Sequence, residues 1–154
     1  MSSAVHAEDQ IGNYRFYIEI KGIADGENSI AGHFKSMSGL ASKQEVIEYR
    51  HGGDRSMRRK PGRTSFTNLV LEKGFTSDDT LFKWHREMVD GKGKDAKKDG
   101  AVVLLDHDGS EKIRWDFFGA WPVSWEGPGL AAGAAETAVE KIEIAVEWVN
   151  AVPK

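Results

Sequence analysis

Apolar and polar residues alternate strictly near both ends of the chain, and this pattern constrains the fold more than any other sequence feature. In residues 14–21 every second side chain is aromatic or β-branched, and residues 141–148 repeat the pattern near the C-terminus. A period of two with such side chains is typical of half-buried strands. Both segments are therefore predicted to be strands that bury one face.

Further strands are predicted between these two segments. They cover residues 30–40 (bent), 44–49, 64–73, 101–105, 112–118 and 121–125. Because Pro122 cannot donate a hydrogen bond to a neighbouring strand, the segment that contains it is expected at the edge of a sheet. The chain contains 17 glycines, which suits turns between many strands.

One α-helix is predicted over about residues 77–90. One stripe of this segment is largely apolar, with the spacing i, i+3, i+4 and i+7, and its members are Leu81, Trp84, His85 and Met88. Ser77 is the expected N-cap, and Gly91 is the expected left-handed stop. The elements together predict a mainly β fold with two packed antiparallel sheets that form a barrel-like sandwich and one covering helix.

The length of 154 residues predicts a single domain over residues 13–154, preceded by a polar arm at residues 1–12. The arm has neither the basic start nor the apolar centre of a signal peptide, and no apolar stretch is long enough to cross a bilayer. We therefore expect synthesis in the cytoplasm without a signal peptide, and no membrane insertion by the chain itself.

Residues that could carry catalysis, a cofactor or a metal are not apparent in the sequence. The absence of cysteine excludes a disulfide scaffold, a thiolate zinc site and a cysteine nucleophile. The five histidines are far apart, and no nucleophile is paired with a base. The acidic turn at residues 106–109 lacks the later glutamate of a calcium loop. The predictions are therefore no enzyme, no cofactor and no metal site.

A long basic loop is predicted at about residues 50–64. Its charged members are Arg50, Asp54, Arg55, Arg58, Arg59, Lys60 and Arg63, in a chain whose net charge is −3. Ordered loops of this length are uncommon and usually functional. Three interpretations remain open: a solvated loop without a partner, a nucleic-acid contact, and a docking arm for the acidic surface of another subunit. The lack of aromatic residues within the loop weakens the second, whereas a preference for arginine suits bidentate pairing with carboxylates.

Ten short motifs occur in a fixed order along residues 14–149. They are FYIEIKG (16–22), SMSGL (36–40), EVIEYRHGGD (45–54), RKPGRT (59–64), LEKG (71–74), LFKW (81–84), LLDHDG (104–109), WDF (115–117), AWP (120–122) and EKIEIA (140–145). This ordered set resembles the tail-tube proteins of contractile phage tails and the inner-tube proteins of phage-tail-like extracellular contractile injection systems. One departure is the segment 129–135, where that family more often carries polar residues.

The resemblance implies a structural subunit that assembles into six-subunit rings, stacked as a hollow tube inside a contractile sheath. It implies partners that include further copies of the chain, the sheath protein, and baseplate and tube-terminating proteins, with cargo protein or DNA in the lumen. It places the chain in a virion tail or an injection particle that acts outside the producing cell. The alternative is a small β-barrel module that binds nucleic acid through the basic loop.

Overall fold

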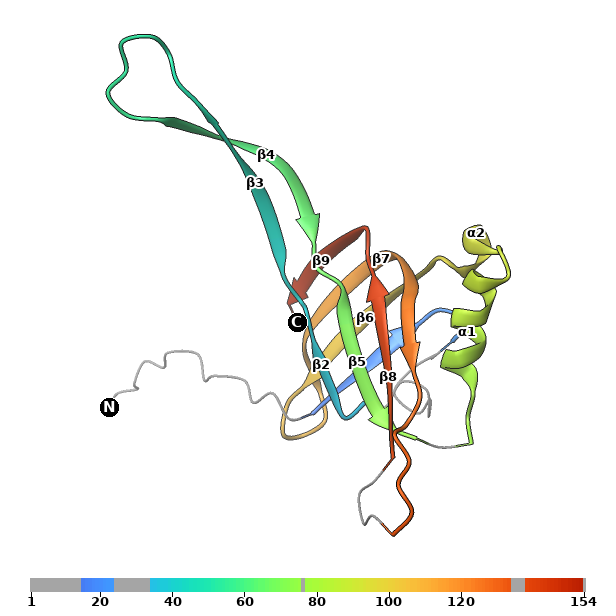
Figure 1. Cartoon of the computed structure of the whole chain (residues 1–154). Coiled ribbons are helices and arrows are strands. Elements are labelled where there is room, and N and C mark those ends of the chain that lie inside the picture. The colour runs from blue at the N-terminus through green and yellow to red at the C-terminus, as the bar shows by residue number, and fades with distance from the viewer. Residues whose placement is uncertain (1–14, 24–33, 76, 134–137, 154) are drawn as a thin grey trace, which may run out of the picture.

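Two antiparallel sheets packed face to face form the body of the protein (Figure 1). The computed structural model describes residues 15–23, 34–75, 77–133 and 138–153. The two sheets are joined through β7 into one seven-stranded order, β1-β6-β7-β8-β5-β2, with β9 also paired to β7. The first sheet contains β1, β6, β9 and the first half of β7, and the second contains β2, β5, β8 and the second half of β7. The bounds of the body strands are β1 Phe16–Ile20, β2 Ser36–Ser38, β5 Leu69–Gly74, β6 Lys98–Leu105, β7 Glu111–Glu126, β8 Val139–Ala145 and β9 Trp148–Pro153.

Strand β7 belongs to both sheets because it is 16 residues long. Its first half pairs with β6 and β9, and its second half, from Trp121, pairs with β8. Pro122 lies in the second half, where β8 is the only described strand that pairs with β7. The predicted edge strand 121–125 is therefore not a separate strand but the end of β7, with one side unpaired in the described structure. The sheets do not close into a barrel. In the described part of the chain, β1, β2 and β9 each pair on one side only.

Helix α1 (Thr80–Val89) covers one side of the sandwich, and the short helix α2 (Gly93–Ala96) follows it. Leu81 and Trp84 of α1 are fully buried in the core. The Trp84 indole Nε1 donates a 2.6 Å hydrogen bond to the carbonyl of Ala96, which fixes α2 against α1. Gly91 ends α1 with a φ of +82°, as predicted from the sequence.

The helix begins three residues later than predicted, and Ser77 does not cap it. Asp78 makes the local contact instead, because its carboxylate accepts a hydrogen bond from the backbone N–H of Thr80 at 3.2 Å. The rest of the helix prediction is confirmed. A core of aliphatic and aromatic side chains from both sheets and α1 holds the body together, with Ile18, Leu71, Phe117 and Ile142 among its buried members.

Two predicted strands are each divided in the structure. The predicted strand 64–73 is the end of β4 and the start of β5, which are separated at Thr67 and Asn68. The predicted C-terminal strand is β8 followed by β9, with a break at Val146 and Glu147. At the second break the alternation of Ile144, Val146 and Trp148 continues, so the sequence period does not show it. At the first break the period shifts by one residue between Phe66 and Leu69, which marks the change of strand.

The polar arm 1–12 and residues 30–33 of the predicted bent strand lie outside the described residues. Within the rest of that segment only the short strand β2 forms.

The largest correction concerns the predicted loop 50–64. Residues 58–64 are strand and not loop, because β3 (Ser42–Tyr49) and β4 (Arg58–Phe66) form an antiparallel hairpin whose turn covers residues 50–57. Strand β4 contains a proline, a glycine and four basic residues, and no alternation of apolar residues reveals it. Its pairing with β3 determines its conformation.

Candidate functional site: a projecting basic hairpin

The β3–β4 hairpin, called the arm below, extends away from the body of the protein (Figure 1). Its strands are eight and nine residues long, which corresponds to roughly 26 Å at 3.3 Å per residue. None of their residues is buried. The arm is attached at its base, where the Phe66 ring meets the Trp148 ring of β9 edge to face with centroids 4.9 Å apart.

Asp54 organises the turn at the tip of the arm. The Arg58 guanidinium donates two hydrogen bonds to its carboxylate, at 2.7 and 3.2 Å, and the backbone N–H of His51 donates a third at 3.2 Å. Arg50 donates two bonds to the carbonyl of Asp54, at 3.1 and 3.0 Å. Gly53 has a φ of +95°, a conformation that side chains other than glycine rarely adopt. The tip therefore has a defined shape although it is exposed.

The contacts of Asp54 and Arg58 favour the charged form of both groups. The hydrogen bonds from Arg58, helped by that from His51, lower the pKa of Asp54. The same carboxylate raises the pKa of Arg58. Both groups are solvated, so this pair orders the tip and contributes little to the stability of the whole chain.

Two further contacts join the strands of the arm. The Arg59 guanidinium forms a 3.1 Å ion pair with Glu48. The Lys60 ammonium lies 5.6 Å from the centroid of the Tyr49 ring, within the range of a cation–π interaction. Exposed contacts of these kinds each contribute less than about 1 kcal/mol.

All seven residues predicted for the basic loop lie in the arm. Arg50, Asp54 and Arg55 are in the turn, whereas Arg58, Arg59, Lys60 and Arg63 are on β4. Among the described residues, Arg55 and Arg63 have no hydrogen bond or ion pair. These two side chains are free to meet carboxylates of another molecule.

The arm also exposes apolar side chains that sequence analysis did not single out. Val46 is 56% exposed and Met57 is 52% exposed, and Ile47 and Tyr49 are exposed as well. An isolated two-stranded hairpin is at best marginally stable in water. In the described structure no other element packs against the arm beyond its base. Its exposed apolar side chains are of the kind that contact with another molecule would bury.

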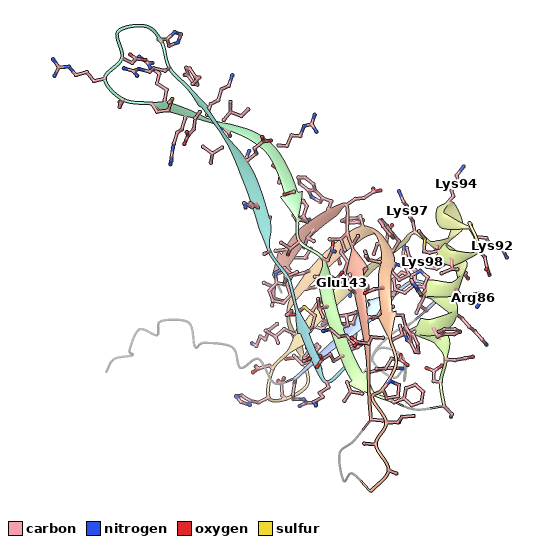
Figure 2. The ribbon with its side chains drawn as sticks, in the orientation of Figure 1. Arg86, Lys92, Lys94, Lys97, Lys98 and Glu143 are labelled. Atoms are coloured by element: carbon pink, nitrogen blue, oxygen red, sulfur yellow. The ribbon has the colours of Figure 1, made fainter. Side chains whose placement is uncertain are left out.

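Charge divides the chain into two parts of opposite sign. Residues 42–66 contain seven basic and three acidic residues, a net charge of +4, whereas the whole chain carries −3. The remaining residues therefore carry −7. A second group of basic residues surrounds α2 (Figure 2), but Arg86 and Lys97 of this group form ion pairs with Asp90 and Glu147.

An apolar groove of about 320 Å³ lies at the base of the arm. It is lined by Leu40, Ala41 and Ser42 at the start of the arm, Phe66 at its end, Trp115 of β7, and Val149 and Ala151 of β9. Trp115 and Val149 also pack against the core. The groove therefore lies at the edge of the hydrophobic core, where part of the core remains open to solvent. No local sequence pattern predicts the groove, because its walls come from segments as much as 111 residues apart.

Several further charged residues form ion pairs within the body of the protein. Arg114 bridges Glu19 at 2.7 Å and Asp116 at 2.8 Å, and all three side chains are partly buried. Lys73 and Glu140 are cross-strand neighbours on β5 and β8 and are almost fully buried, and the Lys73 ammonium forms a 3.8 Å ion pair with Asp78. No group of three or more histidine, aspartate or glutamate side chains suited to a metal ion occurs among the described residues. No helix in the described part of the chain is long and apolar enough to span a membrane.

The family model described as T4-like virus tail tube protein gp19 matches residues 12–150 of the chain. No curated protein sequence matches. Among solved structures, a chain of the PVC sheath-tube complex of an extracellular contractile injection system, in the extended state, is 28% identical, with a TM-score of 0.75 over 96% of this chain and 94% of that one. A chain of the anti-feeding prophage tube-terminating cap is 25% identical, with a TM-score of 0.77 over 99% and 97%.

The structure is also similar, at lower sequence identity, to an Hcp1 protein. Hcp1 from Salmonella typhimurium is 16% identical, with a TM-score of 0.56 over 88% of this chain and 83% of that one. At this identity the likeness concerns the fold alone.

Proposed function

This chain belongs to the family of the T4-like virus tail tube protein gp19 and is a structural tube subunit, and we propose that it assembles into six-subunit rings that stack into a hollow tube. The observation that carries the proposal is the arm, which has no apolar core of its own and exposes Val46, Ile47 and Met57. A neighbouring copy would bury these side chains and supply the missing layer.

The open edges of the body support the same proposal. Exposed strand edges invite pairing with other chains, and a closed ring removes them by continuing the sheet of one subunit into the next. In the described structure β1, β2 and β9 each have one unpaired side. Contacts of the same head-to-tail kind close within a ring, whereas contacts between rings repeat without closing and make a filament.

The arm is proposed to dock on acidic surface of a neighbouring subunit or ring. Its net charge of +4 opposes the −7 of the rest of the chain. Arg55 and Arg63 supply guanidinium groups that have no partner in the described part of the chain, and a planar guanidinium suits bidentate pairing with a carboxylate. Nucleic-acid binding by the arm has no support from the comparisons, and four of its six cations in residues 50–63 already have contacts within the arm.

The proposed role is geometric and involves no catalysis. The related chains come from a sheath-tube complex and a tube-terminating cap, so sheath, baseplate and cap proteins are the proposed partners, with protein or DNA as lumen cargo. The subunit would be made in the cytoplasm, built into a phage-tail-like particle and act outside the producing cell.

Electron microscopy of negatively stained protein tests the proposal directly. The purified chain, alone or co-expressed with its sheath protein, should give six-fold rings or tubes of uniform width. Light scattering coupled to size exclusion should give masses at multiples of six subunits of 17.0 kDa. A stable monomer at high concentration, with the sheath protein present, would contradict the proposal.

A further inference from the structure

The connection between β7 and β8 presents an apolar side chain that the rest of the described chain does not cover. Leu130 is 84% exposed, the highest value among the large exposed hydrophobic residues. Its neighbours in residues 127–133 are glycine, alanine and one proline, and none is charged. A single exposed leucine is ordinary on a protein surface, so its meaning depends on whether the molecule also offers a matching site.

The groove at the base of the arm is such a site. Its lining contains no charged residue, and its volume is about 320 Å³. A cavity of about 150 Å³ lined by apolar side chains holds a benzene molecule, so this groove has room for a leucine side chain and part of its backbone. The small residues beside Leu130 would let the backbone of the connection approach the walls closely.

The groove and Leu130 lie at opposite ends of the body. Figure 1 shows the arm leaving one end of the sandwich and the described part of the β7–β8 connection leaving the other. The seven residues of β8 alone separate these ends by roughly 23 Å at 3.3 Å per residue. One molecule therefore cannot place its own Leu130 in its own groove. A contact between two copies would be end to end, and it would repeat without closing.

We propose that Leu130 of one copy inserts into the groove at the arm base of a second copy stacked on it. The inference rests on the proposed tube and identifies one contact between its successive rings. It assigns a role to residues 127–133, the described residues that follow β7.

Met57 at the tip of the arm is the competing occupant, since it is also exposed. Its position differs from that of Leu130 because Arg55 and Arg58 flank it within two residues. Insertion of Met57 would bring guanidinium groups against uncharged walls, at a cost in desolvation. Leu130 has no charged neighbour within three residues, so its segment matches the lining of the groove.

Cysteine cross-linking tests the contact. Because the chain contains no cysteine, only the introduced residues can form a disulfide. A Leu130→Cys variant is mixed with a second variant that carries one cysteine on the groove rim, at Ala41, Ser42 or Ala151, all of them exposed. After assembly and mild oxidation, at least one rim position should give a disulfide-linked dimer on a non-reducing gel. A disulfide requires Cα atoms within about 7 Å, so the product reports direct insertion.

Two controls make the result specific. Val89→Cys on α1 is 64% exposed in the parent chain and should give no dimer with the rim variants. Met57→Cys should also give none. A dimer from Met57→Cys, or equal dimer yields from Val89→Cys and Leu130→Cys, would overturn the proposal.

A loss-of-contact variant separates this inference from the proposed function. Leu130→Ala should raise the protein concentration needed for tube formation by roughly tenfold or more, as expected when a buried leucine side chain is lost, while single rings persist. Tubes with no cross-link at any rim position, and with normal assembly of Leu130→Ala, would refute the inference and leave the tube intact. Failure of the parent chain to form tubes would refute the proposed function, and this inference with it.

Discussion

The body and the arm of this protein are stabilised in different ways. The body buries aliphatic and aromatic side chains between two sheets and a helix, whereas the arm exposes nearly every residue and is joined by ion pairs and hydrogen bonds at the surface. Apolar burial contributes most of the free energy of folding, and exposed ion pairs contribute little. From this comparison we expect the body to fold by itself, and the arm to gain stability from the proposed neighbouring copy.

Removing one aromatic side chain from each region is the strongest test of this comparison. Trp84→Ala should lower the free energy of unfolding of the monomer by about 4 kcal/mol, because it leaves a cavity and a lost hydrogen bond in the core. Tyr49→Ala, in the arm, should change it by about 0.5 kcal/mol or less. Urea denaturation followed by tryptophan fluorescence or circular dichroism measures both values. Equal losses would show that the arm is part of the folded unit.

The second test of the comparison uses Lys73 and Glu140, two charged residues that are neighbours across β5 and β8 and are buried inside the body. Burial raises the pKa of Glu140, and the Lys73 ammonium opposes that rise. Lys73→Met would leave the Glu140 carboxylate buried without its cation, at a cost of about 3 kcal/mol near pH 7. The same change would remove the 3.8 Å ion pair between Lys73 and Asp78.

The sign of the pH dependence follows from the raised pKa. A glutamate whose folded pKa exceeds its unfolded pKa loses stability as the pH rises through the folded value. The deficit of Lys73→Met should therefore be largest at neutral pH and shrink as the pH falls and Glu140 takes up a proton. The double variant Lys73→Met with Glu140→Leu should recover most of the loss at pH 7. A deficit that does not change with pH would contradict this account.

The comparison also explains which parts of the structure the sequence predicted. Alternation predicted β1 and the first half of β7, because the period of two is visible in their residues. It did not mark β6, since residues 101–105 are all apolar and Val102 and Val103, on opposite faces, are both buried. The stripe that contains Leu81 and Trp84 predicted α1. Strand β4 was predicted as a loop because neither of its faces is buried, so no hydrophobic period marks it. Its conformation depends on pairing with β3.

In the candidate site, too, features formed by residues close in the sequence were predicted and features formed by distant residues were not. The seven residues predicted for docking do lie together, since they are close in the sequence and share one hairpin. The groove was not predicted, because Leu40, Trp115 and Ala151 meet only through the pairing of β7 with β9 and the course of the chain at the arm base. Local charge can be read from a sequence, whereas a surface built from distant segments requires the fold.

Charge reversal in the arm should affect assembly more than folding. Arg58→Glu with Arg59→Glu should abolish tube formation, because it replaces two cations of the docking surface and breaks their pairs with Asp54 and Glu48. The free energy of unfolding of the monomer should change little, because both side chains are solvated. Lys92→Glu with Lys94→Glu is the matched control, with the same change of charge near α2, and should leave assembly intact. Tubes of normal length from the arm variant would show that the arm is peripheral.

The smallest expected effect concerns the order of the tip alone. Hydrogen bonds from Arg58 lower the pKa of Asp54 below its usual value, so the contribution of Asp54 to tip order is complete above its unfolded pKa and is lost as the pH falls through the lower folded value. Asp54→Asn should remove this acid transition and speed the exchange of the His51 amide, which donates to the Asp54 carboxylate. Amides of the core around Phe117 should exchange as in the parent chain. Hydrogen exchange measured by NMR resolves the two regions in one experiment. If the core amides also lost protection, the tip and the body would share one folding unit, and the division between arm and body would be wrong.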